Sequence, residues 1–196
     1  MSPAPTRRRG RPAKFTREDV IHAALDAGID TFTQSEVALA LGVTVQSVYR
    51  RFPTRRLLLE ACIDTTLTSV PPVDSLDPVP ATWEEVIHAC ADQWWALCRR
   101  FPGFTTVVTA YEGPLERFLD PAFTPYLEKL ADLGWSPGQA RFAMSQVESA
   151  AARVHHFLSQ AVPLDEEALD KASRQMRLAT SFIVKGLELS RPEWLL

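Results

Sequence analysis

Hydrophobic residues recur along the chain at the three-to-four-residue spacing of helices, and no convincing alternation of apolar and polar residues predicts a strand. Small polar residues that can cap a helix precede these patterns at Thr16, Thr33, Thr44, Thr54 and Thr82. Two of them, Thr33 and Thr82, are followed three residues later by glutamate, which is the spacing of a capping box. The pattern therefore predicts an all-α fold.

The first third of the chain contains four predicted helices, and the middle two are short. They span about residues 16–27, 33–42, 44–52 and 54–69. Gly42 stands at the tight turn between the two short helices, where a glycine readily supplies a positive φ. Two short helices joined in this way are typical of a helix-turn-helix, and we expect Val48 and Phe52 of the second to face inward.

A proline-rich stretch divides the chain. Residues 70–80 contain four of the fifteen prolines and no helical periodicity, which predicts a linker or stiff loop. The expected division is a basic arm over 1–14, a helix-turn-helix domain with its linking helix over 15–69, and a larger helical domain over 70–196. The last helix has a broader apolar face than one core contact needs, which suggests a subunit interface.

Charge changes this picture because it is unevenly distributed. The 196 residues are 46% hydrophobic and 23% charged, a globular composition with a net charge of −3. Residues 1–56 carry ten basic and five acidic side chains, which gives +5, so the remainder holds −8. A basic end is the footprint expected of contact with nucleic-acid phosphates. We therefore expect the N-terminal part to bind double-stranded DNA and the acidic remainder to stay off it.

Other compartments and chemistries find little support. No stretch approaches a membrane span or a signal peptide, so we expect a cytoplasmic protein without membrane contact. Cys62, Cys90 and Cys98 lie in apolar helical segments and are expected to be buried, reduced thiols. Neighbouring His155 and His156 point about 100° apart on a helix, which disfavours a metal site.

The second short helix offers side chains suited to the major groove of DNA. Its beginning carries the candidates for base reading, because short hydroxyl or amide groups can pair with base edges and a valine can touch a thymine methyl. These are Thr44, Val45, Gln46 and Ser47. Hydroxyl and guanidinium groups elsewhere in the domain are the candidates for phosphate contact. These are Thr33, Tyr49, Arg50, Arg51 and Arg55.

The first fourteen residues include a run of arginines that allows two interpretations. Arg7, Arg8, Arg9 and Arg11 can form an arm that enters the minor groove of DNA, where arginines bind favourably. The same run can equally be a solvated tail, because a charge run alone does not separate the two.

Residues 37–59, read as Val-Ala-Leu-Ala-Leu-Gly-Val-Thr-Val-Gln-Ser-Val-Tyr-Arg-Arg-Phe-Pro-Thr-Arg-Arg-Leu-Leu-Leu, resemble the TetR family of transcriptional repressors. The specific match covers about residues 15–62. The resemblance implies that Tyr49 and Arg55 contact phosphates and that residues 55–69 couple effector binding to DNA release. It also implies a homodimer formed by the last two long helices.

The larger domain is rich in aromatic residues that can line an effector cavity, with His155 or Glu148 as orienting polar groups. These aromatic residues are Trp94, Trp95, Phe104, Tyr111, Phe118, Phe123, Tyr126, Trp135 and Phe157. The alternative is plain core packing, since apolar residues at helical spacing are buried by default.

The sequence as a whole favours a sequence-specific DNA-binding regulator, expected to be a repressor that a small, largely apolar effector releases. We find no constellation of catalytic residues and expect neither an enzyme nor a cofactor. Two alternatives stay open: an all-helical enzyme or carrier that uses the aromatic domain, and an architectural protein that coats DNA without sequence preference.

Overall fold

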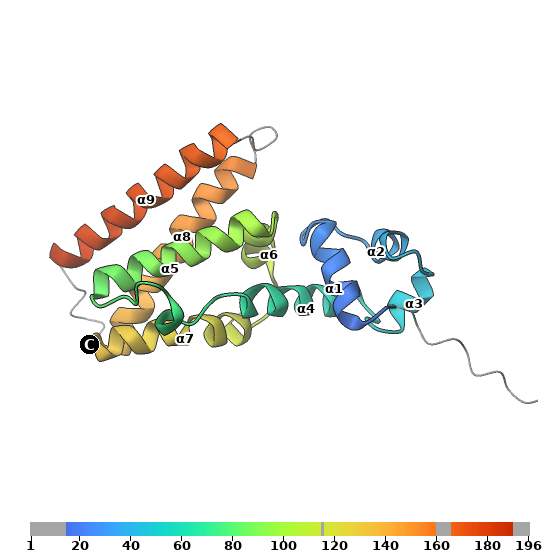
Figure 1. Cartoon of the computed structure of the whole chain (residues 1–196), viewed down its shortest axis with the longest axis horizontal. Coiled ribbons are helices and arrows are strands. Elements are labelled where there is room, and N and C mark those ends of the chain that lie inside the picture. The colour runs from blue at the N-terminus through green and yellow to red at the C-terminus, as the bar shows by residue number, and fades with distance from the viewer. Residues whose placement is uncertain (1–14, 115, 160–165, 190–196) are drawn as a thin grey trace, which may run out of the picture.

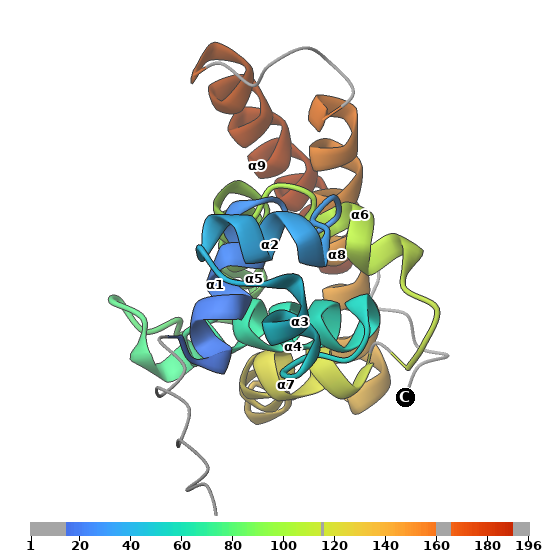
Figure 2. The ribbon, with the colours of Figure 1, turned by 90° about the vertical axis from the view of Figure 1, so that its right-hand side faces the viewer.

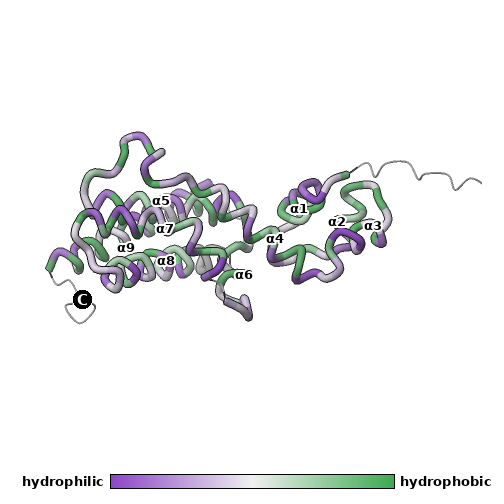
Figure 3. Tube along the Cα trace, turned by 90° about the horizontal axis from the view of Figure 1, so that it is seen from below, coloured by the Kyte–Doolittle hydropathy of each residue, from purple (hydrophilic) through white to green (hydrophobic). Residues whose placement is uncertain are grey.

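The computed structural model describes residues 15–114, 116–159 and 166–189, with the backbone alone for 155–159. The described residues form helices and the loops that connect them, with no strand, which confirms the predicted all-α fold. Figure 1 shows a small group of helices, α1 to α3, at one end, joined through α4 to a larger bundle of α5 to α9. Figure 3 shows hydrophobic and hydrophilic residues alternating along the helices, as expected when each buries one face.

The small group, which we call the head, consists of α1 (Arg17–Asp26), α2 (Gln34–Ala40) and α3 (Val45–Tyr49). Thr16 and Thr33 begin α1 and α2 with complete capping boxes, in which each threonine oxygen accepts a hydrogen bond from the amide three residues on. The head core is fully buried, and it includes Val20, Ala24, Ile29, Phe32, Val37, Val48 and Phe52. The inward orientation predicted for Val48 and Phe52 is confirmed.

Gly42 sets the turn of the helix-turn-helix. Its φ is +64°, in the left-handed region that glycine adopts without the cost of a β-carbon. The chain leaves α2 there and enters α3 after Thr44, whose side chain makes no capping bond to the helix. The turn predicted from sequence is therefore present, and Thr44 occupies the predicted N-cap position of α3, although without a side-chain capping bond.

The long helix α4 (Arg55–Thr68) leads from the head into the bundle. Thr54 caps it, accepting a hydrogen bond from the Leu57 amide, and the helix packs against α1 on one side and α7 on the other. The proline-rich stretch that follows is ordered by a short 3-10 turn, η1 (Val73–Ser75), whose Val73 is buried against α7. Head and bundle therefore share α4 as a common element.

The bundle, which we call the body, consists of five helices. They are α5 (Trp83–Arg100), α6 (Phe104–Ala110), α7 (Glu116–Asp132), α8 (Pro137–Ser159) and α9 (Glu166–Leu189). Helix α5 is central, because it packs against α7, α8 and α9, while α8 and α9 also pack along each other. No helix in the described ranges is long and apolar enough to cross a membrane.

Helix α9 has two apolar faces. One is buried in the body through Ala172, Met176, Val184 and other residues. The other carries Leu178 and Phe182, whose side chains are 71% and 80% exposed. Within the described residues, no surface covers this ring, which is the arrangement expected at a subunit interface.

Candidate nucleic-acid interface and ligand cavity

Helix α3 presents a polar face at the end of the head that lies farthest from the body (Figures 1 and 2). Thr44, Gln46, Tyr49 and Arg50 are exposed, whereas Val48 is buried beneath them. Four of the predicted DNA-contacting residues therefore share one accessible surface, which is the geometry that groove binding requires.

The other side chains at the start of α3 are more enclosed. Val45 and Ser47 are half-buried, and the Ser47 hydroxyl shares a hydrogen bond of 2.9 Å with the Thr44 hydroxyl. The Arg50 guanidinium lies along the same helix, where it donates to the Gln46 carbonyl and to the Ser47 hydroxyl. These contacts place the charge of Arg50 beside the predicted base-reading groups.

Two arginines fasten the end of α3 to the start of α1. Arg51 donates to the Phe15 carbonyl at 2.6 Å, and its guanidinium lies 4.6 Å from the centre of the Phe15 ring. Arg17 donates to the Arg51 carbonyl at 2.8 Å and stacks on Phe52 at 4.0 Å. The Arg51 side chain, predicted to hold phosphate, is thus engaged within the head.

Arg55 is engaged in the same way at the start of α4. Its Nε donates to the Phe32 carbonyl at 2.9 Å, its Nη2 donates to the Asp30 carbonyl at 2.7 Å, and the guanidinium stacks on the Phe32 ring at 4.6 Å. Its phosphate role stays a prediction, and the structure gives it a second role as a fastener of the loop between α1 and α2.

Thr33 and the basic arm complete the predicted DNA contacts. The Thr33 hydroxyl donates to the Glu36 carboxylate at 2.8 Å, and this bond and one from the Thr33 amide lower the Glu36 pKa. The arm of Arg7, Arg8, Arg9 and Arg11 lies outside the described residues. Sequence reasoning missed Gln34, whose buried amide donates to the Phe52 carbonyl at 2.6 Å and ties α2 to the end of α3.

The body contains a cavity of about 340 Å³ between α5, α7 and α8. Its lining residues are Trp94, Glu116, Leu119, Asp120, Phe123, Leu127, Arg141, Met144, Ser145 and Glu148. The rings of Trp94 and Phe123 stack in parallel, with centres 4.8 Å apart and planes 3° from parallel, and form an aromatic wall. Such a cavity is of the size and apolarity that small-molecule sites have.

Glu148 of α8 is one of the acidic groups that line this cavity. Its side chain is half-buried, and burial raises the pKa of its carboxyl. Within the described part of the chain, no hydrogen bond or ion pair reaches this carboxyl. Sequence reasoning had singled out Glu148 as an orienting group, and the structure places it beside Trp94 in the lining.

The other predicted pocket residues lie elsewhere. Trp95 donates its indole hydrogen to Ser173 of α9, Phe104 packs beside Trp94 in the core, and Tyr126 is buried with its hydroxyl bonded to the Pro71 carbonyl. Of the predicted set, the structure brings Trp94, Phe123 and Glu148 to the lining of this cavity, and His155 belongs to the residues whose side chains are not described.

Tyr111 and Phe118 lie together near α4, with ring centres 5.9 Å apart. Tyr111 borders a second, more open pocket of about 320 Å³ between α4, α6 and the loop that follows α1. Phe118 borders a smaller pocket beside the end of α4. These two aromatic residues therefore flank the linking helix instead of the body cavity.

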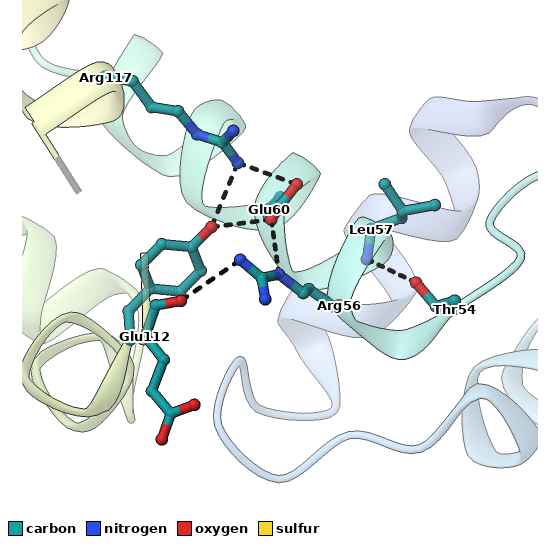
Figure 4. Close-up of polar contacts among 7 residues, drawn as sticks. Thr54, Arg56, Leu57, Glu60, Glu112 and Arg117 are labelled. Atoms are coloured by element: carbon teal, nitrogen blue, oxygen red, sulfur yellow. Dashed lines mark hydrogen bonds and ion pairs between the residues drawn. The ribbon is translucent and has the colours of Figure 1, made fainter. Parts of the chain in front are cut away.

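A polar cluster connects α4 to the loop after α6 and to the start of α7 (Figure 4). Glu60 of α4 accepts hydrogen bonds from the Tyr111 hydroxyl at 2.8 Å, from Arg117 at 2.9 Å and from Arg56 at 3.0 Å. Its pKa is lowered, first by the Tyr111 hydroxyl and then by the two arginines. Arg56 also donates to the Glu112 carbonyl, so the cluster joins α4 to the body through several hydrogen bonds and ion pairs.

Metal binding and cysteine reactivity find little support in the described ranges. Among those residues, no three histidine, cysteine or acidic side chains lie close enough to hold a metal ion. The cysteines are buried as predicted, and burial raises the pKa of Cys62 and Cys98 to about 12. Thiols with such pKa values are unreactive at neutral pH.

No protein-family model and no curated protein sequence matches the chain. Among solved structures, it is similar to a TetR variant from Acinetobacter baumannii AYE in complex with minocycline, with 20% identity, a TM-score of 0.72 and coverage of 92% of this chain and 100% of that one. TetR from the same organism gives 19% identity, a TM-score of 0.71 and the same coverage. A putative transcriptional regulator from Streptomyces coelicolor A3(2) gives 18% identity and a TM-score of 0.53, over 87% of this chain and 98% of that one. The chain therefore has the TetR fold.

Proposed function

We propose that this chain, which has the fold of the TetR repressors, is a sequence-specific DNA-binding transcription regulator that a small molecule releases from its operator. The observation that carries the proposal is the exposed polar face of α3. Gln46, Tyr49 and Arg50 project from a helix whose opposite side, through Val48, is buried in the head. A short helix held this firmly can enter the major groove without rearrangement.

The proposed DNA-binding unit is a homodimer that pairs through α8 and α9. The exposed Leu178 and Phe182 of α9 supply an apolar surface for the partner copy, which carries the same surface about a two-fold axis. Two α3 helices then meet successive major grooves about 34 Å apart on a pseudo-palindromic operator. Repression follows when such an operator overlaps a promoter.

The proposed effector site is the body cavity, and the polar cluster of Figure 4 is the proposed connection to DNA. The start of α7 supplies Glu116 to the cavity and, at the next position, Arg117 to Glu60 of α4. A ligand that favours another position of α7 therefore also favours another position of α4, which begins at the head. The minocycline complex of the similar TetR variant supports a small-molecule site in this fold.

We expect Gln46→Ala to relax sequence preference at one or two operator base pairs by about 1 to 3 kcal/mol, because an amide can read a base edge. Tyr49→Phe is the matched control, since a lost phosphate contact should weaken binding to all sequences alike. Fluorescence anisotropy with single-base operator variants measures both effects. An equal loss on every site for Gln46→Ala would contradict its proposed base-reading role.

The proposal as a whole is tested by selecting fragments of the host's genomic DNA with purified full-length protein, then following the best fragment by anisotropy across salt. A recovered pseudo-palindrome with a steep salt dependence is the expected result. Binding without sequence preference would favour an architectural protein. Absence of binding would refute a DNA-binding role and favour the body as an enzyme or carrier.

The polar cluster of Figure 4, in which Glu60 is the shared acceptor, leads to a prediction about stability and pH. We expect Glu60→Gln to lower the free energy of unfolding by about 1 kcal/mol at pH 7, because an amide forms no ion pair with Arg56 or Arg117. The folded-state pKa of Glu60 lies below its ordinary 4.5, so its contribution is present above that pH and is lost as the pH falls through the folded-state value.

Urea unfolding of the variant and the unsubstituted chain, at pH 7 and at steps below pH 4.5, measures this contribution. Glu128→Gln is the control, because Glu128 is exposed on α7 outside the cluster. A difference in unfolding free energy that stays constant across these pH values would show that Glu60 does not stabilise the fold through its charge.

A further inference from the structure

The body cavity is acidic as well as apolar. Its lining includes three carboxylates, from Glu116, Asp120 and Glu148, against a single guanidinium from Arg141. With all four groups charged, the lining holds a net charge of −2. The largely apolar effector expected from the sequence would carry no positive group to balance this charge.

The single guanidinium, from Arg141, forms an ion pair with one of the three carboxylates, that of Asp120. Arg141 lies 3.4 Å from Asp120, and the two side chains are 62% and 45% exposed, so their ion pair is formed at the solvent-facing edge of the cavity. Exposed pairs of this kind are screened and exert a weak field at a distance. Within the described residues, Glu116 and Glu148 therefore keep no positive partner in this cavity.

Glu148 combines negative charge with an aromatic environment. It lines the cavity together with the stacked rings of Trp94 and Phe123, and with the polarisable side chain of Met144. A half-buried carboxylate attracts a cation through its charge, and the aromatic and thioether side chains beside it offer apolar contact to the rest of the ligand. Together they favour a ligand with a positive group on an apolar body.

We propose that the cavity binds an organic cation with an aromatic or aliphatic body, whose positive group lies at Glu148 and whose body lies against Trp94 and Phe123. The inference rests on the proposed function only in treating this occupant as the effector. A neutral, apolar ligand would exclude water from Glu148 without offsetting its negative charge, which is costly for a charged group. An anion would meet two carboxylates of like charge.

The first experiment compares three ligands that share a naphthylmethyl group, and two of them have the same shape, on the full-length protein. We would titrate (2-naphthylmethyl)trimethylammonium, its neutral carbon analogue 2-neopentylnaphthalene, and the anion 2-naphthylacetate, following tryptophan fluorescence and calorimetry. The cation is expected to bind about tenfold more tightly than the neutral analogue, and the anion more weakly than either. Equal or tighter binding of the neutral or anionic probe, or no binding of any probe, would overturn the proposal.

Two variants test which carboxylate of the cavity causes the preference for the cation. Glu148→Gln keeps the shape of the side chain and should reduce the preference for the cation over its neutral analogue about tenfold. Glu116→Gln, at the exposed start of α7, should reduce the same preference about twofold, because solvent screens its charge. Glu128→Gln, on α7 but outside the cavity lining, is the matched control and should leave the preference unchanged.

These outcomes are separable from those of the DNA experiments. Cation selectivity that depends on Glu148, in a protein that selects no operator, would support the cavity and refute the regulator. An operator-binding protein whose cavity prefers the neutral probe, or keeps its preference in Glu148→Gln, would support the regulator and refute the proposed ligand class.

Discussion

We expect Phe52→Ala to lower the free energy of unfolding by about 3 to 5 kcal/mol, because the substitution empties a fully buried ring position in the head. The ring lies directly after α3, at the junction of all three head helices. Arg17 of α1 stacks on it at 4.0 Å, and Gln34 of α2 donates to the carbonyl of the same residue. Loss of the ring therefore removes both hydrophobic burial and the platform for Arg17.

A loss of this size is a large fraction of the roughly 5 to 15 kcal/mol that stabilises an ordinary domain. The head should then populate unfolded states, and operator affinity should fall with it, although Phe52 contacts no DNA in the proposed complex. Urea unfolding followed by circular dichroism, at one fixed protein concentration, measures the stability. Leu39→Ala is the matched control, because Leu39 is 81% exposed on α2 and should change stability by less than about 0.5 kcal/mol.

A small effect of Phe52→Ala, similar to that of Leu39→Ala, would show that the head does not depend on this ring. A loss of operator affinity without any loss of stability would contradict the argument in another way, since it would place Phe52 at the DNA surface. Both results are measurable on the same two proteins.

The local pattern of the sequence was sufficient to predict the head, because its information lies within a few residues. A threonine followed three residues later by an acidic side chain specifies a helix start, and Gly42 specifies a left-handed turn. The apolar spacing also placed Val48 and Phe52 in the core. Each of these features depends on neighbours in the chain, which sequence patterns record directly.

The partners of the arginines could not be predicted, because they are backbone carbonyls far away in the sequence. Arg51 bonds to the carbonyl of Phe15, and Arg55 to that of Phe32. Every residue has a carbonyl, so no residue type in the sequence marks these acceptors. An arginine at a position typical of phosphate contact looks the same whether it faces DNA or the backbone.

For the apolar residues of the cavity, too, the partners in the fold could not be predicted from the sequence. Trp94 and Trp95 are adjacent on α5, yet one lines the cavity and the other bonds to Ser173 of α9. Periodicity indicates that both are buried, but which neighbouring helix each one meets depends on how α7, α8 and α9 pack around α5. Acidic lining residues on α7 and α8 come together only in the folded body.

Arg55→Lys distinguishes the two roles of Arg55, because lysine keeps the charge and loses the planar fork of donors. We expect it to lower the free energy of unfolding by about 2 to 3 kcal/mol in the absence of DNA. The guanidinium donates to two backbone carbonyls, those of Asp30 and Phe32, and a single ammonium cannot bond both while stacking on the Phe32 ring.

The measurement pairs urea unfolding with the salt dependence of operator binding. Arg50→Lys is the control, since Arg50 bonds only within α3 and is exposed, so it should change stability by less than about 0.5 kcal/mol. If Arg55 acts through phosphate charge alone, Arg55→Lys will unfold like the unsubstituted chain and keep its salt slope. If it acts as the fastener seen in the structure, the loop after α1 loosens, stability falls, and operator affinity falls because α3 loses the support that positions it.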